Sequence, residues 1–132
     1  MIWLSREEAL AGASRLRDVR CVVDFFGLAS PGTGGSGLWG LGLQEDEVRE
    51  FVAGIGAPVL ALHGEAEEVV PVDDTRRLEE ACRGHGVAFE AVYYPGAVGH
   101  SFVWPGNARF DLAAEADAWG RVHQFLSRNL GA

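Results

Sequence analysis

Three apolar runs typical of β-strands alternate with helical patterns along this chain of 132 residues. Residues 21–26 are rich in β-branched and aromatic side chains, residues 58–63 are almost entirely apolar, and residues 88–94 form a third run. A continuous apolar run is typical of a parallel strand that is covered on both faces. Glu90 interrupts the third run, which indicates a more exposed strand at the edge of a sheet.

The segments around these runs repeat apolar residues at helical spacing. Residues 48–55 and 78–82 do so between the strands, and we expect Asp73 or Asp74 to cap the second of these helices. Another helix is predicted over residues 6–17. A final helix, ended by Gly131, is predicted to pack through one apolar side made of Trp119, Val122, Phe125, Leu126 and Leu130.

This order of elements favours an α/β fold. Strands joined by helical crossovers form parallel sheets with helices on both faces. We therefore predict a three-layer α-β-α sandwich with a short parallel sheet of about three strands, in a single domain over residues 1–132.

The composition excludes several classes of partner. The formal net charge is −8 and the chain contains no lysine, so its surface repels phosphate backbones and we expect no nucleic acid. No apolar run approaches the roughly 20 residues that cross a bilayer, and no signal peptide is visible. We therefore expect no membrane partner and a cytoplasmic location. Cys21 and Cys82 fit neither zinc nor redox spacing, and we expect no metal or other cofactor.

Acid–base residues follow the second and third apolar runs. Glu67 lies after the second run and His100 after the third. Because the carboxyl ends of parallel strands meet at one edge of a sheet, we expect these side chains to lie within hydrogen-bond reach. A histidine base needs such an acid to hold its tautomer and stabilise the imidazolium. Glu65, Glu68 and Asp73 are alternative acids, and His63 is expected to pack beneath the site.

The same stretches carry the motifs of a known family. The pattern P-V-L-x-x-x-G-x-x-D-x-x-V-P is matched by Pro58, Val59, Leu60, Gly64, Glu67, Val70 and Pro71. Residues 94–102 match Y-P-G-A-G-H-x-F, with Val98 as one additional residue, and the aromatic and alanine pattern of the tail follows over residues 110–126. On these residues the chain resembles the C-terminal half of the dienelactone hydrolase family. The resemblance implies a truncated α/β-hydrolase fold.

Two departures from the family pattern affect the chemistry. Glu67 stands where the family has aspartate, and glutamate also serves as the triad acid on this fold. Trp104 stands where dienelactone hydrolases often have an arginine suited to a substrate carboxylate. The resemblance therefore implies an acid–histidine pair. The departure at Trp104 argues against a carboxylated lactone as substrate.

The resemblance places a nucleophile at Ser5. The family's elbow, G-x-S-x-G or G-x-C-x-G, has glycines on both sides of the nucleophile, whereas Trp3 and Glu7 flank Ser5 here. These side chains do not suit the strained turn of an elbow. Ser5 and Glu8 also fit a capping box at the start of a helix. Both roles, nucleophile and helix cap, stay open.

The implied activity is hydrolysis of small esters or lactones by nucleophilic acyl transfer. Ser5 attacks, His100 transfers the proton and Glu67 orients His100. Because the elbow is degenerate, we expect this activity to be impaired. The alternatives are a non-catalytic remnant that serves as an interaction module and a half-enzyme completed by another chain. An exposed edge on the strand over residues 21–26 predicts a homodimer.

Overall fold

The computed structural model describes residues 19–26 and 44–131. Within these residues three strands form one sheet in the order β1-β2-β3, and both neighbouring pairs are parallel. The strands are β1 (Val22–Phe25), β2 (Val59–Gly64) and β3 (Phe89–Tyr94). The parallel sheet of three strands predicted from the sequence is confirmed.

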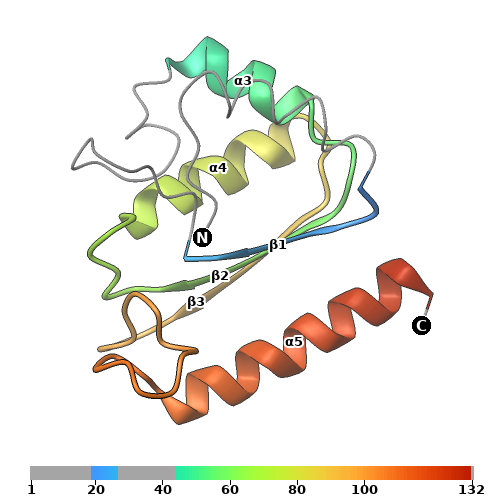
Figure 1. Cartoon of the computed structure of the whole chain (residues 1–132). Helices are drawn as coiled ribbons and strands as arrows, with labels where there is room; N and C mark the ends of the chain where they lie inside the picture. The colour runs from blue at the N-terminus through green and yellow to red at the C-terminus, as the bar shows by residue number, and fades with distance from the viewer. Residues whose placement is uncertain (1–18, 27–43, 132) are drawn as a thin grey trace.

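Helices cover both faces of this sheet (Figure 1). α3 (Glu45–Ala53) and α4 (Val72–Gly84) lie together on one face, and α5 (Leu112–Leu130) runs along the other. Each strand-to-strand connection contains a helix, because parallel neighbours cannot be joined by a tight turn. The predicted three-layer arrangement is therefore confirmed.

The central strand β2 divides the core into two clusters. All six of its residues are buried, which explains why the sequence is apolar there without alternation. Val59 and Ala61 pack with residues of α3 and α4, whereas Leu60 and Leu62 pack with residues of α5. Among the described strands β2 alone has a neighbour on each side, so it fixes the positions of the loops that follow it.

Among the described strands β3 lies at one edge of the sheet, as Glu90 predicted. Glu90 is exposed and forms a salt bridge of 2.7 Å with Arg128 of α5. A charged side chain pointing outward discourages pairing of this edge with another strand.

The predicted cap of α4 is wrong. The helix begins at Val72, and its N-cap is Pro71, which makes no side-chain cap hydrogen bond. The proline ring restricts φ, here −53°, and this starts the helix earlier than the aspartates suggested. Asp73 and Asp74 lie instead in the first turn, where their negative charges interact favourably with the helix dipole.

The predicted packing side of α5 is only partly right. Trp119 and Leu130 are about 40% exposed, and the buried stripe contains Ala114, Ala118, Val122 and Phe125. Alanines at 114 and 118 let the helix approach the sheet closely. One residue further along, Trp119 is turned about 100° away from that stripe. Its ring contacts Phe25 of β1, with centroids 5.3 Å apart.

The end of α5 is as predicted, because Gly131 adopts a left-handed φ of 72° there. The predicted helix over residues 6–17 lies outside the described residues, and nothing tests it. In the part of the chain that the structure describes, no helix is long and apolar enough to span a bilayer.

Candidate active site

The loops that follow β2 and β3 are joined through their backbones. The N–H of Glu65 donates to the carbonyl of Tyr94 (2.8 Å), and the N–H of Ala66 donates to the carbonyl of Val98 (2.9 Å). The first bond follows directly from the parallel register, which places Gly64 beside Tyr94. The two loops therefore hold each other at the carboxyl ends of the strands.

Gly64 permits this close approach. A Cβ atom at position 64 would lie 2.2 Å from the carbonyl oxygen of Val98, which real Cβ atoms essentially never do. Gly99 is also tight, with a Cβ position 3.1 Å from the carbonyl oxygen of Ala66. Val98, the residue added to the family pattern, thus supplies the carbonyl that binds the other loop.

Glu67 and His100 form the pair that the sequence predicted. Nδ1 of His100 lies 2.8 Å from Oε2 and 3.0 Å from Oε1 of Glu67. The Glu67 side chain is fully enclosed, and the His100 side chain is 12% exposed. Because Nδ1 faces the carboxylate, it carries the proton and donates it. The other nitrogen, Nε2, then faces away from Glu67 as an acceptor, which a general base requires.

Backbone groups fix the Glu67 carboxylate. Oε1 accepts hydrogen bonds from the N–H groups of Val69 (2.7 Å) and Val70 (3.3 Å). A buried carboxylate is costly unless its oxygens are hydrogen-bonded. Here the turn after Glu67 provides those donors, so the side chain is held in one orientation toward His100.

His63 lies beneath this turn, as predicted, and anchors it. Its Nε2 is 2.9 Å from the carbonyl of Val70, and its Nδ1 is 2.9 Å from Oγ1 of Thr75 in α4. Nε2–H therefore donates to Val70, and the Thr75 hydroxyl donates to Nδ1. Burial lowers the pKa of His63, and the nearby His100 and Arg76 lower it further, against the opposing effects of Val70 and Glu67. His63 is therefore neutral and connects the turn to α4 through its two hydrogen bonds.

The other acids considered from the sequence are engaged elsewhere. Glu65 and Asp73 both bind Arg76, at 3.2 Å and 3.0 Å, on the exposed side of α4. Glu68 forms a salt bridge with Arg109. Position along the turn decides which carboxylate meets the histidine, and sequence spacing alone left that open.

One aromatic ring, that of Phe26, packs against His100 on the side of β1. Phe26, directly after β1, has its ring centroid 5.1 Å from that of His100 and 5.4 Å from that of Phe102. Phe26 is buried and has a φ of 69°, an uncommon left-handed conformation for a phenylalanine. The sequence showed Phe26 only as the last residue of a strand, because a backbone reversal at a non-glycine residue leaves no sequence signal.

The candidate nucleophile Ser5 lies outside the described residues. Of the two cysteines, Cys82 is fully buried in α4, and burial raises its pKa to about 12. A protonated, enclosed thiol is not a nucleophile. Cys21 precedes β1, at the opposite end of the sheet from the acid–histidine pair. Within the described part of the chain, no hydroxyl or thiol is hydrogen-bonded to His100.

A groove beside the edge strand lies apart from this pair. It has a volume of about 420 Å³ and is lined by β3 and α5, including Tyr94, Asp117 and Arg121. Tyr94 donates to Asp117 (2.8 Å), as does Arg121 (2.6 Å). The polar groups of the groove therefore satisfy one another, and neither Glu67 nor His100 lines it.

Comparison of the sequence with known protein families identifies the family of this chain. The dienelactone hydrolase family matches residues 7–130. The chain belongs to the dienelactone hydrolase family. Two relatives, both named putative carboxymethylenebutenolidase, come from Methylorubrum extorquens (34% identity over 77 residues, 58% of this chain and 26% of the relative) and Synechocystis (29% over 119 residues, 90% and 45%). The chain spans less than half the length of either relative.

Two solved structures share the fold of this chain. A putative dienelactone hydrolase from Klebsiella pneumoniae matches with a TM-score of 0.63 and 21% identity, over 86% of this chain and 44% of that one. An acylaminoacyl peptidase from Pyrococcus horikoshii matches with a TM-score of 0.61 and 12% identity, over 92% and 22%. The described residues of this dienelactone hydrolase family chain thus form part of an α/β-hydrolase fold, as the sequence predicted.

Proposed function

We propose that this chain is a hydrolase of the dienelactone hydrolase type, acting on small esters or lactones by nucleophilic acyl transfer. One observation carries the proposal: Glu67 holds His100 by Nδ1 and leaves Nε2 facing away from the carboxylate. In this reaction His100 takes a proton from the nucleophile and returns it to the leaving group, while Glu67 stabilises the imidazolium. Family membership supports this reaction class.

Ser5 is the proposed nucleophile, with its role as a helix cap kept as the rival. Because Trp3 and Glu7 replace the glycines of the elbow, the serine is not expected to be well placed. The elbow also aims the backbone N–H of the residue after the nucleophile at the oxyanion, so a degenerate elbow misplaces one oxyanion-hole donor. Loss of one such donor costs about 2.7–4 kcal/mol of transition-state stabilisation. Turnover of 4-nitrophenyl acetate should therefore be weak.

The test measures hydrolysis of 4-nitrophenyl acetate by the chain and by three variants. We expect Ser5→Ala and His100→Ala each to abolish the residual rate, because the nucleophile and its base act as a unit. His123→Ala is the matched control, since His123 is exposed on α5. A rate that survives Ser5→Ala but not His100→Ala would assign another nucleophile. No turnover, or turnover untouched by His100→Ala, would contradict the proposal and favour a non-catalytic interaction module.

A half-enzyme completed by another chain is the second candidate, favoured by the short match to the relatives. The homodimer expected from the sequence is a separate proposal, in which the apolar strands over residues 21–26 of two copies cover each other about a two-fold axis. We propose a homodimer on this basis, and sedimentation at micromolar concentration tests it. A single species of 14.2 kDa would refute the dimer. The cytoplasmic location stays a prediction from the sequence.

A further inference from the structure

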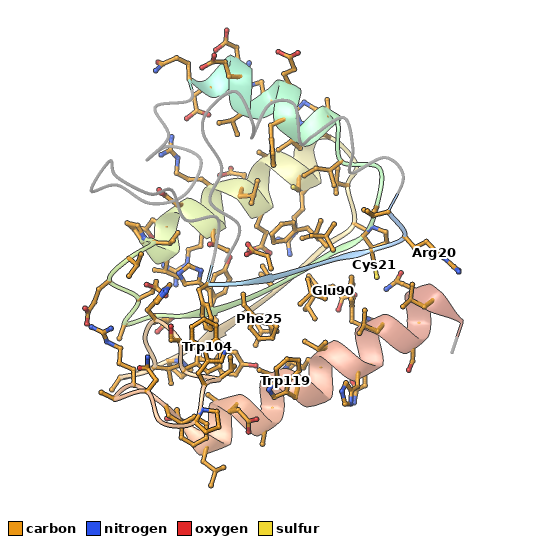
Figure 2. All side chains as sticks on the ribbon, viewed as in Figure 1. Arg20, Cys21, Phe25, Glu90, Trp104 and Trp119 are labelled. Carbon is orange, nitrogen blue, oxygen red and sulfur yellow. The ribbon has the colours of Figure 1, made fainter. Side chains whose placement is uncertain are left out.

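Two consecutive phenylalanines at the end of β1 pack on the same face of the sheet. Phe25 contacts Trp119 of α5, and Figure 2 shows Phe25 on the α5 side of the sheet. Phe26 belongs to the core cluster on that side, with its ring centroid 5.7 Å from that of Phe25. In an extended strand successive side chains point to opposite faces. The left-handed φ of Phe26, 69°, therefore directs its ring to the α5 side.

A second left-handed residue follows His100 directly. Ser101 has a φ of 64° and is buried. The residues before and after it, His100 and Phe102, both contact the ring of Phe26, with centroids 5.1 Å and 5.4 Å away. Among the described residues, Phe26 and Ser101 are the two non-glycine residues with a left-handed φ. Both therefore lie next to the imidazole, one in space and one in sequence.

Backbone hydrogen bonds hold both left-handed residues. The N–H of Phe26 donates to the carbonyl of Leu62 in β2 (3.0 Å), and the carbonyl of Ser101 accepts from the N–H of Trp104 (3.1 Å). A left-handed backbone is costly at a residue that carries a side chain, and it persists where the surroundings require it. Such residues cluster at functional sites. Their position around His100 therefore points to a role in its geometry.

The Glu67 carboxylate alone does not fix the direction of the imidazole. Its hydrogen bonds hold the ring of His100 at one atom, Nδ1, and a ring held at one atom can still rotate about it. The Phe26 ring provides a second contact with the imidazole. Two contacts define where Nε2 points, and the direction of a base strongly affects proton transfer.

We propose that Phe26 and Ser101 are positioning residues for His100. The reversal at Ser101 brings His100 and Phe102 to the Phe26 ring, and the Phe26 ring keeps the imidazole in the orientation in which Nδ1 meets Glu67. The inference rests on the proposed function, because it concerns the base of that reaction.

Exchange of the Nδ1 proton of His100 with water tests the role of Phe26 without any need for turnover. An imidazole N–H bound to an enclosed carboxylate gives a low-field proton NMR signal, which is assigned by its absence in His100→Gln. Phe26→Leu keeps an apolar side chain but removes the ring. We expect exchange to become about two- to tenfold faster, which is the equilibrium effect of one lost ring contact.

Phe125→Leu is the matched control for this measurement. Phe125 is a buried phenylalanine of the same core cluster, but it lies on α5, and its replacement should leave the exchange rate at that of the parent. Equal exchange in the parent and in Phe26→Leu, or an equal increase in Phe125→Leu, would overturn the proposal. Absence of the signal from the parent would also overturn it, because an imidazole held in one orientation keeps this proton.

Substitutions at position 101 test the left-handed backbone. Glycine adopts a positive φ without steric cost, whereas a β-branched valine disfavours it. Ser101→Gly should therefore keep the exchange rate of the parent, and Ser101→Val should raise it. Ala114→Val is the matched control, because it enlarges a buried residue of the Phe26 core cluster at a helical position of α5. Exchange as fast in Ser101→Gly as in Ser101→Val, or raised equally in Ala114→Val, would contradict the role of Ser101.

Kinetics separate this inference from the proposed function. If 4-nitrophenyl acetate is hydrolysed through His100, Phe26→Leu should lower kcat and leave KM unchanged, because only the direction of the base has altered. A raised KM with unchanged kcat would make Phe26 a substrate contact and overturn the inference. No hydrolysis by the parent would contradict the proposed function, and the exchange measurement would still decide the positioning. Hydrolysis that requires His100, together with exchange unaffected in Phe26→Leu, would uphold the function and overturn the positioning.

Discussion

Acidification should weaken the fold through one side chain, His63. The imidazole is 1% exposed and uses both nitrogens, donating to Val70 and accepting from Thr75. Burial lowers its pKa below the ordinary histidine value of about 6.5. A proton therefore binds more readily to His63 in the unfolded chain than in the folded one. The stability that neutral His63 contributes is fully present above pH 6.5 and is lost as the pH falls toward its folded pKa.

Linkage sets the size of this effect. If His63 stays neutral in the folded protein, the unfolded chain alone takes up the proton. The free energy of unfolding then falls by at most about 1.4 kcal/mol between about pH 7.5 and 5.5. A smaller loss is expected to the extent that the hydrogen bond to Val70 and the charge of Glu67, which both raise the pKa of His63, offset the effect of burial. A loss of about 1.4 kcal/mol is a large fraction of the free energy of unfolding of a small domain.

Comparison with His63→Gln separates the pH-dependent contribution of His63 to stability from that of the other titrating groups. Urea unfolding followed by far-UV circular dichroism gives the free energy of each protein at the two pH values. At neutral pH the variant should be less stable by about 1–3 kcal/mol, because a buried hydrogen-bonded group is lost. That gap should narrow on acidification. His123→Gln, at an exposed site, should follow the parent. A gap that stays constant or widens as the pH falls would refute the reasoning.

Further predictions concern the close contacts and the buried thiol. Gly64→Ala should destabilise the fold by about 1–3 kcal/mol in urea unfolding, because its Cβ meets the Val98 carbonyl. Gly120→Ala is its control and should stabilise α5 by up to about 1 kcal/mol, since no atom lies within 4 Å of that Cβ. Equal effects of the two would contradict the role of the contact. Cys82 should resist a thiol reagent at pH 8 until the protein unfolds. If both cysteines are labelled in the native protein, the Cys82 thiol is not buried.

The fold was predictable from the sequence because its central strand is covered on both faces. The apolar run of β2 and the helices beside it indicated a parallel sheet, and Glu90 indicated its edge. The details that failed depend on backbone geometry. Pro71, not an aspartate, is the N-cap of α4, and the buried stripe of α5 contains Ala114 and Ala118 but not Trp119.

The acid–histidine pair was predictable because Glu67 and His100 follow neighbouring strands. The choice among four nearby acids was settled by the turn, whose backbone N–H groups point at Glu67. The position of Phe26 against His100 was not predicted, because it depends on a left-handed φ at a residue type that rarely adopts one.

The support of the acid–histidine pair comes from a short, continuous stretch of chain. His63, the turn that holds Glu67, Thr75 and the loop that carries His100 all belong to β2, α4, β3 and their connections. Contacts between segments close in sequence form early and cheaply in entropy during folding. Glu67 and His100 can therefore come together within one β-α-β unit, independently of β1 and α5.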